Sequence, residues 1–94
     1  MIAVTIWGCV ASLDAVPEAC RILAQTIERT QTPGWIHGRC LVDTNDRRHV
    51  LVYEEWGARQ SWDAWFNSDA RQTMLREITP LLEDDLHIDI YEEV

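Results

Sequence analysis

The sequence predicts an α+β fold in which one four-stranded antiparallel sheet carries helices on one face. Four stretches alternate apolar and polar residues with the two-residue period of a β-strand. Helical periodicity occurs between the first two of these stretches and again between the last two. The middle two stretches lie close enough in sequence to form a hairpin. A chain of 94 residues is the size of one domain, so we expect residues 1–94 to fold as a unit.

The N-terminal third of the chain is expected to form a strand over residues 2–10 and a helix from about 14 to 30. Aliphatic residues occupy alternate positions at the start of the strand. Pro17 lies near the first turn of the predicted helix, where its missing N–H costs no hydrogen bond. A Thr-Pro-Gly segment at residues 32–34 ends the helix. The apolar residues at helical spacing are Val16, Cys20, Leu23 and Ile27.

A hairpin is predicted next, with strands over residues 35–43 and 48–56. The sequence Thr-Asn-Asp-Arg at residues 44–47 connects them. Asn and Asp suit such a turn because they tolerate left-handed backbone angles and hydrogen-bond their own main chain. Gly57 then ends the second of these strands.

Two helices and a last strand are expected after the hairpin. Residues 59–67 form a short helix, and Ser68 or Asp69 caps a third helix that runs to about residue 79. Residues 86–92 alternate again and form the last strand. The order strand-helix-strand-strand-helix-helix-strand is that of the ferredoxin-like split βαβ plan.

The composition excludes several classes of function. A net charge of −8 argues against nucleic acid and against anionic membranes, since both need a basic surface. No apolar run approaches the roughly 18 residues of a membrane span, and the N-terminus lacks the basic start of a signal peptide. The three cysteines have no metal-binding spacing, so we expect free thiols and a cytoplasmic protein.

Strand parity separates the two faces of the predicted sheet. One face is almost wholly apolar and is expected to lie under the helices, with Glu54 and Trp56 continuing it at the end of the third strand. The apolar members of this face are Ile2, Val4, Ile6, Ile36, Cys40, Val42, Val50, Val52, Ile88 and Ile90.

The opposite face is too aromatic to meet only water. We expect it to pack sheet to sheet against a second copy of the chain, which would give a barrel-like homodimer. The residues expected at this contact include Trp7, Trp35, Leu51, Tyr53 and Tyr91.

All three histidines, His37, His49 and His87, fall on the same outer face. A metal site is one interpretation, although their spacing matches no known ligand motif. The other interpretation is that they meet solvent or hydrogen-bond Glu55 or Asp89 across the dimer contact. We therefore predict no metal ion.

Large aromatic residues gather where the third strand ends. Trp56 closes that strand, and Trp62, Trp65 and Phe66 follow within the short helix. Aromatic side chains at the mouth of a small sheet are typical of a pocket for a flat organic molecule. The alternative is that they fill the hydrophobic core between sheet and helices.

Glu54 and Asn67 are the polar candidates beside these aromatic residues. A carboxylate on a helix-covered face needs a cation, hydrogen bonds or a raised pKa. A structural ion pair with Arg59 or Arg71 is one expectation for Glu54, and a role as general base or in substrate positioning is the other. Asn67 either caps the end of the short helix or hydrogen-bonds a ligand.

Four segments resemble the antibiotic biosynthesis monooxygenase family of small dimeric α/β-barrel proteins. Residues 32–35, Thr-Pro-Gly-Trp, are similar to the family's turn into its second strand, and residues 53–56, Tyr-Glu-Glu-Trp, match its Tyr-Glu-x-Trp strand. Residues 61–68 and 88–92 resemble the following helix and the closing strand. The resemblance covers essentially the whole chain, in order.

The resemblance implies a homodimer with one pocket per subunit between sheet and helices. It also implies a small monooxygenase that oxidises an aromatic, polyketide- or quinol-like substrate with molecular oxygen and without a cofactor. The sequence agrees, because no glycine-rich phosphate loop or nucleotide-binding motif is present. On this hypothesis Trp65, Glu54 and Asn67 carry the chemistry. The substrate-binding residues are then Trp56, Trp62, Phe66 and Leu75.

Two alternatives stay open at this point. Haem-degrading members of the family also carry Trp at the position of Trp65, but their haem-ligating His stands where this chain has Leu75. Haem chemistry without that ligand would lack its proximal support. The second alternative is a non-catalytic dimer that binds a ligand, and its sign would be indoles packed without a cavity around Trp65.

Overall fold

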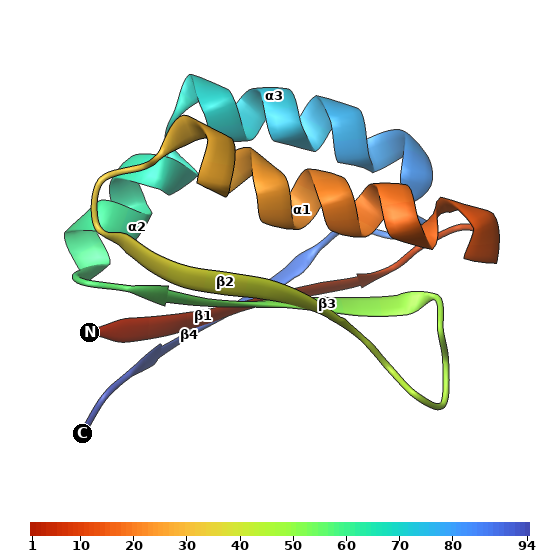
Figure 1. Ribbon diagram of the computed structural model, residues 1–94, viewed down its shortest axis with the longest axis horizontal. Helices are drawn as coiled ribbons and strands as arrows, with labels where there is room; N and C mark the ends of the chain where they lie inside the picture. The colour runs from red at the N-terminus through yellow and green to blue at the C-terminus, as the bar shows by residue number, and fades with distance from the viewer.

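The computed structural model describes residues 1–94 and has two layers, a twisted sheet and a set of helices on one of its faces (Figure 1). The strand order in the sheet is β2-β3-β1-β4, and all neighbours are antiparallel. This arrangement confirms the predicted ferredoxin-like α+β fold. The strands are β1 (Ile2–Cys9), β2 (Trp35–Val42), β3 (His49–Trp56) and β4 (His87–Glu92). The helices are α1 (Val16–Thr30), α2 (Arg59–Phe66) and α3 (Asp69–Ile78), with short 3-10 turns η1 (Leu13–Ala15) and η2 (Thr79–Leu81).

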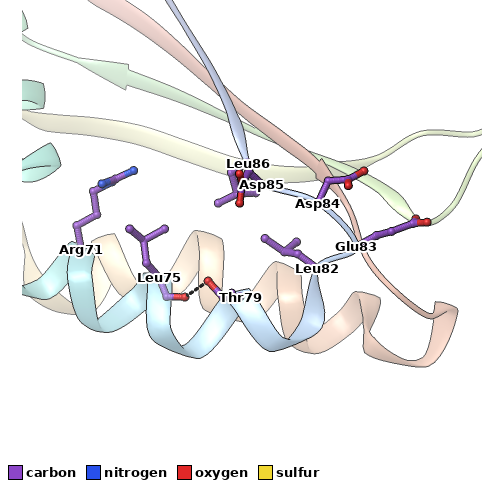
Figure 2. A pocket seen from close by; sticks show the side chains of 8 residues that line it. All are labelled: Arg71, Leu75, Thr79, Leu82, Glu83, Asp84, Asp85 and Leu86. Atoms are coloured by element: carbon purple, nitrogen blue, oxygen red, sulfur yellow. Dashed lines mark hydrogen bonds between the residues drawn. The ribbon is translucent and has the colours of Figure 1, made fainter.

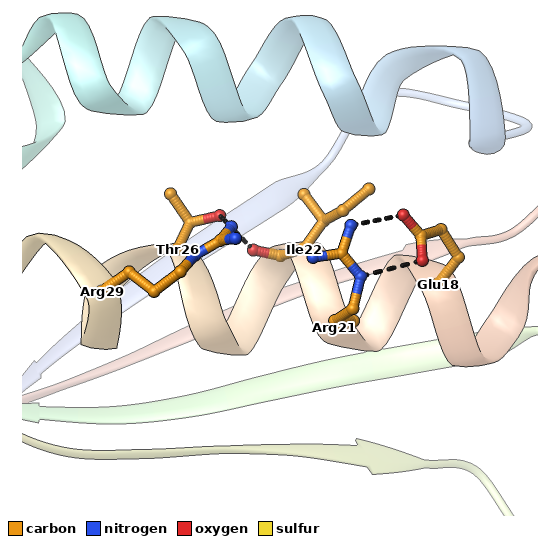
Figure 3. Close-up of polar contacts among 5 residues, drawn as sticks. All are labelled: Glu18, Arg21, Ile22, Thr26 and Arg29. Carbon is orange, nitrogen blue, oxygen red and sulfur yellow. Dashed lines mark hydrogen bonds and ion pairs between the residues drawn. The ribbon is translucent and has the colours of Figure 1, made fainter.

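Helix α1 follows β1, crosses the sheet and buries one face while the other meets solvent. Its buried side chains include Ile22, Leu23 and Ile27, close to the predicted stripe. On the exposed face the Arg21 Nε donates to Glu18 Oε2 at 2.9 Å (Figure 3). On the buried face the Thr26 hydroxyl donates to the Ile22 carbonyl at 2.7 Å. At 15 residues α1 is the longest helix, and no helix could serve as a membrane span.

The covered face of the sheet forms the core. Along β1 and β3 every second residue is buried and its neighbours are only half-buried, which is the pattern of strands with one face under helices. In β2 and β4 the residues on the same face are at most half-buried. The helices therefore seal the middle of the sheet and leave its two edges partly open.

The predicted faces are correct for most positions but wrong at the start of β2. A β-bulge shifts the register between Trp35 and His37, so Trp35 lies opposite Trp56 on the covered face. Trp35 packs against the core, while Ile36 points outward with 55% of its surface exposed. A bulge adds one residue to a strand, and this reverses the parity on which the prediction rested. Trp35 is thus not part of the outer face.

The turn into β2 depends on Gly34. Its φ is +84°, a left-handed backbone angle that favours glycine. A Cβ at this position would also overlap the Ser61 side chain at the start of α2. The Gly34 carbonyl accepts a hydrogen bond from the Gly57 N–H at 2.8 Å, so this turn is tied to the end of β3.

Ser68 separates α2 from α3. Its hydroxyl oxygen accepts a hydrogen bond from the Arg71 backbone N–H at 3.1 Å, which makes Ser68, rather than Asp69, the N-cap of α3. The same hydroxyl donates to the Trp65 carbonyl at 2.7 Å, so one side chain bridges the two helices.

We predict that Ser68→Ala lowers the free energy of unfolding by about 1 kcal/mol, because the first turn of α3 loses its side-chain acceptor. The matched control is Ser12→Ala at the N-cap of η1, where the side chain makes no capping hydrogen bond. Urea denaturation followed by tryptophan fluorescence measures both. Equal losses in the two variants would contradict the capping role of Ser68.

Candidate functional site

Glu54 is the buried carboxyl of this protein. It lies on the covered face of β3 with 1% of its surface exposed. Its Oε1 accepts a hydrogen bond from the Trp56 indole Nε1 at 3.2 Å. Within the sheet its nearest cross-strand neighbours are Val4 on one side and Gly38 on the other, and neither offers a charge.

The predicted ion pair between Glu54 and an arginine is wrong. The Arg59 Nε instead lies 3.1 Å from Asp63 Oδ1 along α2. The Arg71 guanidinium lies 4.0 Å from the centroid of the Phe66 ring and donates to the Phe66 carbonyl at 3.4 Å. Both arginines are held on the helix layer, so Glu54 has no cation to compensate its charge.

Burial raises the pKa of Glu54 to about 7, and the Trp56 hydrogen bond opposes this only in part. Removal of water disfavours the charged form of a carboxyl group. A carboxyl with a pKa near 7 exists in both forms at neutral pH, which is the property a general base or acid needs. Glu54 is therefore chemically the most distinctive titratable group in the sequence-predicted site.

Trp35 lies near Glu54 on the covered face, whereas the sequence predicted it on the outer face at the dimer contact. Its Nε1 is buried and has no hydrogen-bond partner. A Cβ placed on Gly38 would lie 3.4 Å from this nitrogen and 3.6 Å from Glu54 Cγ, so the indole and the carboxylate side chain flank the same point on the sheet. Gly38 leaves room for both. The bulge that reversed the parity of Trp35 hid it from sequence reasoning.

The predicted aromatic group is present, and most of it is packed core. Trp56 and Trp62 meet edge to face with ring centroids 5.7 Å apart, and both are buried. Trp65 is buried as well, with 2% of its surface exposed, and this packing is the sign expected of the non-catalytic ligand-binding alternative. Phe66 is 40% exposed, and its ring centroid lies 6.0 Å from that of Trp62. These side chains keep water from the end of β3, next to Glu54.

Asn67 lies apart from Glu54, at the exposed end of α2. Its side-chain amide donates to the Asp63 carbonyl at 2.9 Å, and its backbone N–H bonds the same carbonyl. The side chain therefore acts as a helix cap, one of the two roles expected for it.

Leu75 lines an open pocket of about 460 Å³ between α3 and the segment that leads into β4 (Figure 2). Three leucines form the apolar part of its wall, and Arg71 lies at one end of the row along α3. Partial burial lowers the pKa of Arg71, although the group stays a cation. The lining residues are Arg71, Leu75, Thr79, Leu82, Glu83, Asp84, Asp85 and Leu86.

The pocket is adjacent to a partly open edge of the sheet. Leu86 directly precedes β4, and the covered face of that strand carries Ile88 and Ile90, which are only half-buried. Ile90 pairs with Val4, and Val4 pairs with Glu54, so one cross-strand row joins the open edge to the buried carboxyl.

The histidines lie on the outer face, as predicted. The Trp7 ring stacks on His87 with centroids 4.0 Å apart and lies 5.2 Å from the ring of His49. His37 accepts a hydrogen bond from the Arg39 Nε at 3.2 Å. No group of three potential metal-binding side chains comes together anywhere in the chain.

We predict that Glu54→Gln makes the protein more stable at pH 8 and nearly unchanged at pH 4. Because the folded-state pKa of about 7 exceeds the ordinary value of 4.5, stability falls as pH rises between these values. The full penalty is about 3 kcal/mol at pH 8. Denaturation of both proteins at each pH isolates the effect. A difference in stability that does not change with pH would contradict the raised pKa.

Comparison with known proteins relates this fold to solved structures and the chain to a family. One solved antibiotic biosynthesis monooxygenase is 20% identical over 100% of this chain and 99% of its own, with a TM-score of 0.80. A conserved protein of Methanosarcina mazei Go1 is 22% identical over 99% of this chain and 92% of its own, with a TM-score of 0.84. SnoaB of Streptomyces nogalater, a cofactor-independent oxygenase, is 11% identical over 99% of this chain and 92% of its own, with a TM-score of 0.83.

These structural likenesses establish the fold. No curated protein matches the sequence. The family model for antibiotic biosynthesis monooxygenases matches residues 2–77, which include the Glu54 strand and the tryptophans of α2. The chain therefore belongs to the antibiotic biosynthesis monooxygenase family.

Proposed function

We propose that this protein is a cofactor-independent monooxygenase that oxidises an electron-rich hydroxylated aromatic, such as a quinol or a polyketide ring. The observation that carries the proposal is Glu54, a buried carboxyl without a cation and with a pKa of about 7. Such a group can take a proton from an acidic aromatic at neutral pH. Membership of the monooxygenase family, and the likeness to SnoaB, support the reaction class.

The substrate would enter through the pocket beside Leu75. The three leucines there can contact a flat ring, and the cation of Arg71 suits an oxyanion at that end of the pocket. The carboxylates of Glu83, Asp84 and Asp85 would keep such an anion at the Arg71 end. To reach Glu54 from this pocket, the substrate would pass the half-buried Ile88 and Ile90 and displace the buried Val4 side chain, which lies between Ile90 and Glu54 in the cross-strand row.

The proposed reaction needs no redox group of the protein. Glu54 takes a proton from the substrate, and the resulting carbanion reduces oxygen as a new carbon–oxygen bond forms. The peroxide takes the proton back and loses water, which leaves a carbonyl group. One oxygen atom ends in the product and the other in water. Trp35 Nε1, a buried donor without a partner, would hydrogen-bond the developing oxyanion.

The tryptophans would act by excluding water. In the proposed site Trp56, Trp62 and Trp65 form the dry wall beside Glu54, where charge interactions are stronger than in water. Phe66 would lie nearer the entrance, because it is exposed and its ring contacts Arg71 of the pocket wall, whereas the Asn67 side chain serves as a helix cap. Since Trp65 is fully packed, Trp65→Ala would leave a large cavity and mainly reduce stability. Glu54 is the better residue for a test of function.

Haem degradation finds no support in these residues. Leu75 occupies the position of the family's haem ligand and provides no coordinating atom. The three histidines lie on the opposite face of the sheet.

Oxygen uptake with the hydroxyanthrone dithranol tests the proposal. We expect uptake above the autoxidation rate, rising with pH through about 7 as Glu54 ionises, and reduced at least about 100-fold in Glu54→Gln. Glu28→Gln, on the exposed face of α1, is the matched control and should retain full activity. Equal activity in both variants would remove Glu54 from the mechanism, and no uptake by the wild type would favour a ligand-binding protein.

A pair of bulky substitutions on α3 locates the substrate in the same assay. Leu75→Trp fills the proposed entrance and should raise KM, whereas Thr73→Trp adds the same bulk to an exposed position and should not. An unchanged KM in Leu75→Trp would show that the substrate does not use this pocket.

We propose in addition that the protein is a homodimer through its outer sheet face. Leu41 and Tyr91 expose 48% and 55% of their surfaces there, next to the half-buried Trp7, Leu51 and Tyr53. Exposed apolar and aromatic side chains gathered on one sheet face are typical of a protein interface.

Light scattering should then give a mass twice that of the 10.9 kDa chain. Leu41→Glu would place a charge in the contact and should yield monomers. Leu13→Glu, at an exposed leucine of η1 outside the sheet, should leave the dimer intact. A monomeric wild type, or dimers that persist in Leu41→Glu, would contradict this interface.

A further inference from the structure

Cys20 of α1 and Cys40 of β2 meet between the helix layer and the sheet. Their Sγ atoms are 2.8 Å apart, which is only about 0.8 Å beyond the length of an S–S bond. Both residues are half-buried and pack against the hydrophobic core. Nothing in the spacing of 20 residues along the chain predicts this contact, because it requires α1 to lie across β2.

Cys9 is excluded from the pair by its position. It stands at the end of β1 opposite His49, on the outer face of the sheet. The sheet itself therefore separates Cys9 from the other two sulfurs. The chain has one matched pair of thiols and one solitary thiol.

We propose that Cys20 and Cys40 are a redox-sensitive pair that forms an intramolecular disulfide in the folded protein. The oxidant would be a small disulfide of the glutathione class. One cysteine thiolate attacks a glutathione sulfur, a mixed disulfide forms, and one glutathione thiol leaves. The second cysteine then attacks the protein sulfur of the mixed disulfide and releases the other glutathione thiol. Two protein thiols are oxidised and one glutathione disulfide is reduced.

The surroundings assign the order of attack. Burial raises the pKa of Cys40, and hydrogen bonding and charge repulsion from Cys20 raise it further. The thiolate is the nucleophile in exchange, so a thiol held protonated reacts slowly. The Cys40 thiol also donates its hydrogen bond to Cys20 Sγ, so Cys20 is then the sulfur that attacks first and Cys40 the one that resolves the mixed disulfide.

The bond would fasten the open edge of the sheet to the helix layer. Cys40 belongs to the edge strand β2 and is two residues from Gly38. The Trp35 indole of the same strand lies over Gly38. The closed loop includes the second half of α1 and the turn at Gly34. Cross-linking restricts this loop in the unfolded chain and should raise the melting temperature of the oxidised protein by roughly 15 °C.

The test uses full-length protein incubated with oxidised glutathione. Thiol titration in denaturant should fall from three groups to one, and mass spectrometry of proteolytic fragments should join the peptides of Cys20 and Cys40. The Cys9→Ala variant should lose both of its thiols in the same way. Cys40→Ala should stop at a glutathione adduct on Cys20, whereas Cys20→Ala should gain little adduct on Cys40.

Three thiols that persist in the folded protein, while the urea-unfolded chain oxidises under the same conditions, would overturn the proposal. A disulfide that contains Cys9 would overturn it as well. A Cys20–Cys40 bond with adducts of equal yield in the two single variants would support the pair and reject the assigned order. None of these measurements depends on oxygenase activity.

Discussion

Glu54 lies on the sheet face that the helices keep from water, and the character of the site follows from that single constraint. Its charge has no cation to offset it and only one indole N–H to stabilise it. Such a group is costly in its ionised form, which is why burial raises its pKa to about 7. A structure that needed only stability would have placed an apolar side chain at this point. The acid is consistent with a function that uses its proton.

The two faces of the sheet serve different purposes. The covered face holds the core and the buried carboxyl, and the turn at Gly34 places the Trp35 indole beside it. The outer face carries the stacked rings of Trp7 and His87 and a patch of exposed apolar side chains. Because strand residues alternate strictly between faces, one strand supplies both surfaces at once. The β-bulge in β2 is the exception. It places Trp35 on the covered face near Glu54 rather than on the outer face.

The extent of sequence-based prediction differs between the fold and the site. The strands and helices were predictable because alternation and helical spacing record which side of each element is buried. Glu54, Trp56 and Trp62 were correctly grouped, since they are near one another along β3 and α2. The hydrogen-bond and charge partners of Glu54 were not predicted correctly. An arginine on a neighbouring helix can contact another acid or an aromatic ring instead, as Arg59 and Arg71 do.

The sequence by itself determined the element order, the covered face of β1 and β3, and the presence of an acid on that face. Local periodicity and turn residues carry this information, and they do not depend on distant contacts. Only the tertiary structure decided that Trp35 lies beside Glu54 and that Cys20 meets Cys40. Both contacts depend on how one element lies across another. Neither a bulge nor a helix crossing changes the spacing of apolar residues in the sequence in a way that reveals it. Packing in three dimensions therefore set the chemistry that surrounds the predicted acid.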